Sequence, residues 1–114
     1  MEWDGKDFRE YERIDGELIP ECFKFFFIER GFGNKIKAIT TDITVKGIRF
    51  LIPPEAGIFS VGDCLIIYPL DKDYKLVGEI IHVISLSKEK IYFGVKLLKT
   101  KSLDEYIKVV EELF

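Results

Sequence analysis

The sequence predicts an all-β protein, a six-stranded antiparallel β-barrel followed by a C-terminal α-helix. Six short apolar segments, separated by turn residues, have the length and spacing of strands in a sandwich or barrel. A closed barrel is favoured because it leaves no exposed strand edges. The ten phenylalanines among 114 residues imply a dense aromatic core within a single domain.

Residues 1–20, before the first expected strand, are charged, are punctuated by glycine and end at Pro20. They lack sustained periodicity, so we expect an N-terminal arm over 1–20, mostly extended, and a folded domain over 21–114. An arm of this kind is ordered only where something holds it.

The expected strands are rich in aromatic and β-branched residues and are bounded by glycine, proline or charged turns. In chain order they are Glu21–Arg30, Lys35–Ile43, Gly47–Ile52, Cys64–Tyr68, Leu76–Ile84 and Ile91–Leu98. After them, Ser102 and Glu105 form a capping-box pattern, and apolar residues recur at helical spacing. This predicts an amphipathic helix over about 102–114 that packs on the barrel.

Composition narrows the classes of function. The net charge of −3 opposes a general nucleic-acid binder, because phosphate neutralisation supplies most of that affinity. The N-terminus is polar and no apolar run approaches the ~20 residues that span a bilayer, so we expect a cytoplasmic protein without membrane insertion. Cys22 and Cys64 lie in apolar, strand-like segments and are expected to be buried thiols.

The sequence contains no catalytic pattern. The only histidine, His82, lies within an expected strand, where a lone histidine is structural or surface-exposed. The chain has no nucleophile in a glycine elbow, no Walker-type phosphate loop and no cysteine or histidine cluster with metal-ligand spacing. We therefore expect a binding protein and not an enzyme, with no metal and no cofactor.

Two features are suited to reading a planar, anionic ligand, and the first is the arginine pair on the arm. Arg9 and Arg13 are four residues apart, and arginine offers a planar fork of donors to phosphate oxygens and purine edges. The other interpretation is that both arginines pair with neighbouring carboxylates at the surface.

The second feature is Asp42-Ile-Thr-Val-Lys-Gly47, between two expected strands. Asp42 and Thr44 can organise an ordinary turn by bonding nearby backbone, or they can offer an acceptor and a donor to a ligand. Gly47 allows the backbone to be approached closely. The residues alone leave both interpretations open.

Together, R-x-x-x-R on an N-terminal arm and D-x-T-x-x-G before a strand resemble the PilZ domain family. That family's pattern is R-x-x-x-R followed by [D/N]-x-S-x-x-G. The segments Ile48-Arg-Phe50, Val61-Gly-Asp63 and Tyr92-Phe-Gly-Val-Lys-Leu97 agree with the family's layout. The resemblance covers residues 8–98.

The resemblance implies a PilZ-like split barrel that binds the second messenger cyclic di-GMP on its outer surface. It implies that Arg9 and Arg13 contact phosphate and guanine, that Asp42 and Thr44 bond guanine or order the site, and that Gly47 lets the ligand approach. The signal would then pass to an unidentified protein partner.

The sequence departs from the family at Thr44, where serine is usual, and Glu10 and Glu12 lie within the arginine motif. Negative charge there weakens the attraction of phosphates. These glutamates favour an alternative, a PilZ-like barrel that binds no nucleotide. Such a module would dock a partner through its hydrophobic surface or its C-terminal helix, with Tyr106 or Phe114 in the contact.

Overall fold

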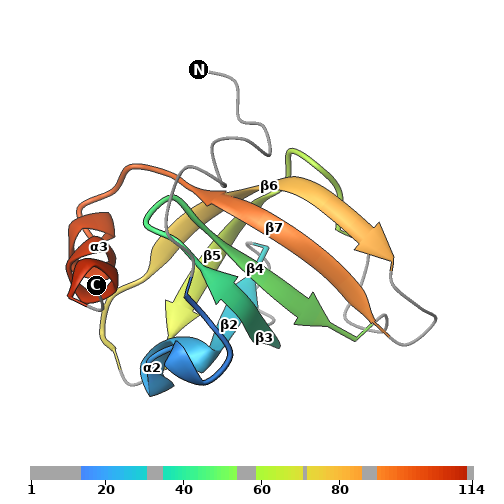
Figure 1. Cartoon of the computed structure of the whole chain (residues 1–114). Helices are drawn as coiled ribbons and strands as arrows, with labels where there is room; N and C mark the ends of the chain where they lie inside the picture. The colour runs from blue at the N-terminus through green and yellow to red at the C-terminus, as the bar shows by residue number, and fades with distance from the viewer. Residues whose placement is uncertain (1–13, 31–34, 54–58, 71, 86–89, 113–114) are drawn as a thin grey trace.

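Six strands close into an antiparallel barrel in the computed structural model (Figure 1). The structure describes residues 14–30, 35–53, 59–70, 72–85 and 90–112. Its strands are β1 (Ile14–Asp15), β2 (Phe25–Glu29), β3 (Lys35–Ile43), β4 (Gly47–Ile52), β5 (Cys64–Pro69), β6 (Leu76–Ser85) and β7 (Ile91–Leu97). Its helices are the 3₁₀ helix η1 (Gly16–Leu18), α2 (Glu21–Lys24) and α3 (Leu103–Glu111). The predicted all-β barrel with a C-terminal helix is confirmed.

The barrel is closed by the pairing of β3 with β4. The strand order around it is β3, β2, β5, β6, β7 and β4, and every neighbouring pair is antiparallel. The short strand β1 adds to β3 outside this ring, with Ile14 opposite Ile43 and Asp15 opposite Asp42. Ile14 and Ile19 are buried, so the last part of the expected arm packs on the barrel.

A connected series of aromatic rings runs through the core. It begins at Tyr106 of α3 and continues through Phe23, Phe26, Phe50, Phe93 and Phe59, with successive ring centroids 5.2 to 5.6 Å apart. All six side chains are buried, as expected from the number of phenylalanines. The series therefore links the two α-helices, α2 and α3, to the interior of the barrel.

The prediction of a strand over Glu21–Arg30 is wrong at its start, because residues 21–24 form the helix α2. Pro20 precedes the helix, and its carbonyl oxygen accepts a 2.8 Å hydrogen bond from the N–H of Phe23. This turn directs Phe23 onto Tyr106, so tertiary packing overrides the local β preference of the aromatic residues. Figure 1 shows α2 and α3 at the same end of the molecule.

The predicted C-terminal helix is present, but its capping box is not. Ser102 has helical backbone angles (φ −77°, ψ −16°) and its side chain makes no cap hydrogen bond. An N-cap side chain needs an extended backbone to reach the first turn, so the pattern at Ser102 and Glu105 has no such role here. Tyr106 and Val110 form the buried face of α3.

The prediction of two buried thiols is wrong for Cys64, which is exposed, and Cys22 is only partly buried. Cys64 begins β5 and opposes Glu79 on the outer face of the barrel, so the apolar run around it did not indicate its orientation. Among the described helices, none has the length and apolar character needed to cross a membrane.

Candidate ligand-binding site

The segment Asp42–Gly47 joins β3 to β4 through a tight turn. The N–H of Thr44 donates to the carbonyl oxygen of Gly47 over 2.9 Å. Thr44 Oγ1 in turn accepts the backbone N–H groups of Lys46 and Gly47, each over 3.1 Å. The Thr44 side chain is fully buried. Its hydroxyl oxygen therefore organises the turn, one of the two roles that the sequence left open.

Tyr106 of α3 holds the same turn from the interior. Its hydroxyl donates a 2.6 Å hydrogen bond to the carbonyl oxygen of Thr44 and lies 3.5 Å from that of Gly47. Burial raises the pKa of Tyr106 well above its usual value of 10.0, so the hydroxyl stays protonated and remains a donor. The sequence did not indicate this hydrogen bond to the turn. Because Tyr106 is buried, it cannot form the partner contact suggested for it.

A β-bulge places Asp42 on the outer face of the barrel. Thr40 opposes Phe50 and Asp42 opposes Arg49, so Thr41 is an extra residue in β3. Without the bulge, regular alternation from the buried Thr40 through Thr41 would turn the Asp42 carboxylate towards the core. The bulge is held by a 3.3 Å hydrogen bond from Thr41 Oγ1 to the carbonyl oxygen of Arg49.

Arg49 pairs with Asp42 across the two strands, a contribution to the site that the sequence motifs did not indicate. Its Nη1 lies 3.5 Å from Asp42 Oδ2, and the two side chains are only 16% and 13% exposed. The pair therefore fixes the orientation of the carboxylate beside the turn.

The row that begins with Asp42 and Arg49 continues to Gly94 of β7 and His82 of β6. A second bulge, between Ile80 and His82, turns the histidine to the outer face. Its ring lies over Gly94, where any Cβ atom would collide with it. Burial, and then the Arg49 guanidinium, lower the pKa of His82 below its usual value of 6.5. A half-buried, neutral imidazole thus borders the site.

Arg9 and Arg13 lie outside the described residues. The described chain begins at Ile14, which opposes Ile43, the residue before Thr44. The next pair is Asp15 opposite Asp42. The structure therefore brings Asp42, Thr44 and Gly47 together and also brings the end of the arm beside them.

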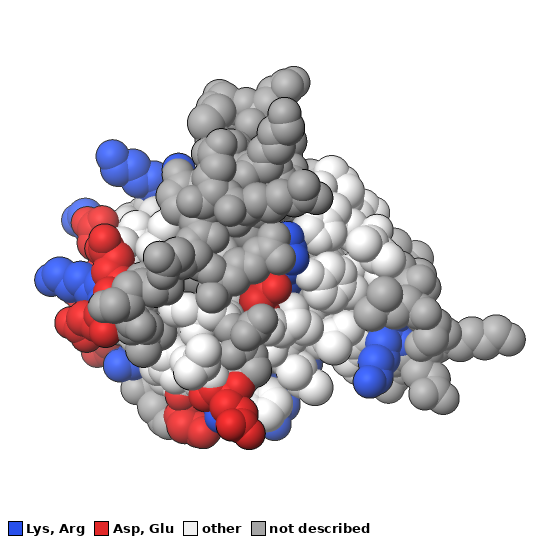
Figure 2. All heavy atoms as spheres, viewed as in Figure 1, with Lys and Arg blue, Asp and Glu red and all other residues white. Residues whose placement is uncertain are grey.

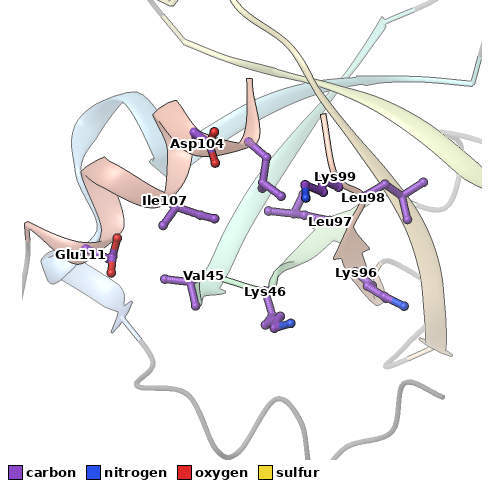
Figure 3. Close-up of a pocket in the computed structure, with 10 residues that line it drawn as sticks. Val45, Lys46, Lys96, Leu97, Leu98, Lys99, Asp104, Ile107 and Glu111 are labelled. Carbon is purple, nitrogen blue, oxygen red and sulfur yellow. The ribbon is translucent and has the colours of Figure 1, made fainter. Parts of the chain in front are cut away.

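A pocket of about 550 Å³ lies next to the turn, between α3 and the end of β7 (Figure 3). Lys46, Lys96 and Lys99 line it, and Lys96 opposes Gly47 in the strand register. Figure 3 shows Asp104 and Glu111 on α3, across from Lys46 and Lys96. The side of the pocket nearest Gly47 is therefore cationic in a chain whose net charge is −3. In the part of the chain that the structure describes, no group of three His, Cys, Asp or Glu residues could hold a metal.

Fold and site together define a small β-barrel module with a polar site on its outer face. Two solved structures share its fold. The PilZ domain of YcgR from Escherichia coli, solved with c-di-GMP, is 13% identical with a TM-score of 0.64, and the match covers 92% of this chain and 90% of that one. The Bacillus subtilis inhibitor of motility (MotI/DgrA) is 14% identical with a TM-score of 0.65, over 92% of this chain.

This chain spans about half of the Bacillus protein, 49% of its length. No family model and no curated protein sequence matches the chain. The two structural likenesses show that the chain has a PilZ-like fold, as the resemblance in sequence predicted.

Proposed function

We propose that this chain is a non-enzymatic receptor module that binds cyclic di-GMP on the outer face of its barrel. The observation that carries the proposal is the pairing of β1 with β3, with Ile14 opposite Ile43 and Asp15 opposite Asp42. This pairing places Ile14, the residue that follows the R-x-x-x-R motif in the sequence, beside the segment that carries Asp42, Thr44 and Gly47.

In this proposal Arg9 and Arg13 bind the phosphates of the ligand, and the turn between β3 and β4 recognises its guanine base. Arg9 and Arg13 donate charge-assisted hydrogen bonds to phosphate and stack on guanine. Asp42, held beside the turn by Arg49, accepts from the N–H edge of guanine. Thr44 orders the turn, and Gly47 gives the ligand room. Lys46 and Lys96 add positive charge nearby.

Ligand binding would engage the arginines of the arm and change the surface that the module presents to a protein partner in the cytoplasm. The likeness to the YcgR PilZ domain, which was solved with c-di-GMP, supports this choice of ligand.

Calorimetry with cyclic di-GMP tests the proposal. Arg13→Ala is expected to weaken binding at least about tenfold, because a hydrogen bond to a charged group contributes about 1.5–3 kcal/mol. The matched control is Arg30→Ala, since the Arg30 guanidinium lies over the Phe59 ring, 4.6 Å from its centroid, on a different part of the barrel. Absence of heat at high micromolar ligand, or an Arg13→Ala variant that binds like the parent, contradicts the proposal.

The second candidate is a PilZ-like module that binds no nucleotide and acts by contacting a protein. This candidate is favoured because the Asp42 and Thr44 side chains already have partners within the protein. Asp42 is paired with Arg49, and the Thr44 hydroxyl oxygen accepts two backbone N–H groups. This candidate predicts that cyclic di-GMP leaves the thermal unfolding midpoint unchanged. A nucleotide-dependent shift excludes it.

A further inference from the structure

Four apolar residues form a continuous line across four strands on the outside of the barrel. Ile39 of β3 opposes Leu51 of β4, Leu51 opposes Tyr92 of β7, and Tyr92 opposes Ile84 of β6. Directly opposed side chains on one face of a sheet are in contact range. We call Ile39, Leu51, Tyr92 and Ile84 the apolar row.

The apolar row is open to solvent. Ile39 is 51% and Ile84 is 48% exposed, and Leu51 and Tyr92 between them are partly exposed. The outer face of an antiparallel barrel usually alternates to polar residues, and single exposed apolar residues need no explanation. Four in register are different, because they expose a contiguous apolar surface. Figure 2 views this side of the molecule, where uncharged surface extends over β4, β7 and β6.

A hollow of about 300 Å³ lies at one end of the apolar row. It is lined by Lys37, Ile39, Leu51, Ile52, Pro53 and Lys90. Its walls are almost wholly apolar, so it can take one large apolar side chain. Among the residues that the structure describes, both charged residues in its lining are lysines. The Nζ of Lys37 lies over the Phe25 ring, 4.2 Å from the ring centroid.

The positive charge of the two lysines that line the hollow favours some binding partners over others. A second copy of this chain packed face to face would bring the same lysines together, and like charges in an interface are costly. A segment that carries carboxylates beside a large apolar residue satisfies both the hollow and the lysines. Such complementarity also steers association and suppresses wrong partners.

We propose that the apolar row and its hollow are a docking surface for an acidic segment of a partner protein, which inserts one large apolar side chain between Lys37 and Lys90. The protein partner that the proposed function requires would bind at this surface. Docking there does not depend on nucleotide binding. The surface lies one row away from Asp42 and Arg49 and is formed by different residues.

The test is selection of random dodecapeptides displayed on phage against the immobilised full chain, followed by fluorescence anisotropy with the selected synthetic peptides. Selected peptides are expected to carry aspartate or glutamate beside a large apolar residue. Ile39→Ser and Lys37→Glu should each weaken their binding at least tenfold. Leu18→Ser and Lys72→Glu, exposed residues of matched type elsewhere, should leave it unchanged.

Other outcomes overturn the proposal. One is a selection that yields no peptide, and another is a selection that yields basic peptides. The proposal is also contradicted if the Ile39→Ser variant has the parent's unfolding midpoint and still binds the selected peptides as the parent does. Sedimentation that shows a dimer abolished by Ile39→Ser assigns the row to a second copy. Binding to phosphatidylserine vesicles abolished by the same change assigns it to a membrane surface. Calorimetry with cyclic di-GMP is run in parallel on the Ile39→Ser variant. If this variant loses peptide binding but still binds the nucleotide, the docking surface is tested independently of the proposed function.

Discussion

The hydroxyl of Tyr106 and the carbonyl oxygen of Thr44 are joined by a 2.6 Å hydrogen bond between residues 62 positions apart. The donor belongs to the C-terminal helix and the acceptor to the turn of the candidate ligand site. Both residues are fully buried. The position of α3 and the conformation of the turn are therefore coupled directly, without passing through the barrel strands.

Removing this hydroxyl should destabilise the protein without disturbing the aromatic core. Tyr106→Phe keeps the ring against Phe23 but leaves the buried Thr44 carbonyl without its donor. An unsatisfied buried group costs about 1–3 kcal/mol, and urea denaturation should show a loss of that size. Tyr92→Phe, on the outer face, is the control. Equal stability of Tyr106→Phe and the parent would show that the bond contributes nothing.

The turn should depend on the Thr44 oxygen and not on its methyl group. Thr44→Val removes the acceptor of two backbone N–H groups in a fully buried position, so we expect a loss of about 1–3 kcal/mol or more in the free energy of unfolding. Thr44→Ser keeps the acceptor and should cost less. If valine is tolerated as well as serine in the same urea measurements, the turn does not rely on this side chain.

Position 94 should tolerate only glycine, because the His82 ring occupies the space that a Cβ atom there would need. Gly94→Ala places a Cβ atom in the space of the imidazole ring, and overpacking of this kind costs about 1–3 kcal/mol. Combining it with His82→Ala should relieve the collision, with a coupling energy above about 0.5 kcal/mol in a double-mutant cycle. Gly78→Ala meets Ile67 and Val95 inside the barrel instead, so it should show no coupling to His82. Additive losses for Gly94 and His82 would contradict the expected contact.

His82 should make the protein less stable as the pH falls. Its folded pKa is lowered, so the unfolded chain binds the proton more readily, and stability declines as the pH drops through the unfolded value of about 6.5. Because His82 is the only histidine, the difference between the parent and His82→Asn in urea denaturation at several pH values isolates this contribution. An imidazole NMR titration should give a midpoint below 6.5 that rises in Arg49→Met. A midpoint of 6.5 in the parent would remove this pH dependence, and a higher midpoint would reverse its sign.

The strand pattern was predictable because turns and apolar residues define it locally. Gly62, with φ +97°, forms one of the glycine turns expected to bound the strands. The carboxylate of Asp63 supports this turn by accepting the N–H of Ser60 over 3.0 Å. The start of β2 was not predictable, because Phe23 has a strand-forming side chain and its helical turn depends on a contact with Tyr106 at the other end of the chain.

The candidate site was only partly predictable, because two β-bulges change the face of the barrel on which its side chains lie. Asp42, Thr44 and Gly47 stand in one short motif, but the pairing of Asp42 with Arg49 depends on the bulge at Thr41. Continuing the register of Ile39 with Leu51 and Thr40 with Phe50 would have placed Thr41 opposite Arg49. The bulge at Ile81 hides the outward orientation of His82 in the same way, since each extra residue shifts the side chains after it to the other face.

The aromatic series from Tyr106 to Phe59 also has a consequence for how the molecule comes apart. Its rings belong to both helices, to three barrel strands and to the segment before β5, so no one element can leave without exposing the faces of its neighbours. Separate fraying of α3 is thereby penalised. Helix and barrel should melt in a single cooperative transition, with the same midpoint whether the amide circular dichroism or the aromatic signals are followed.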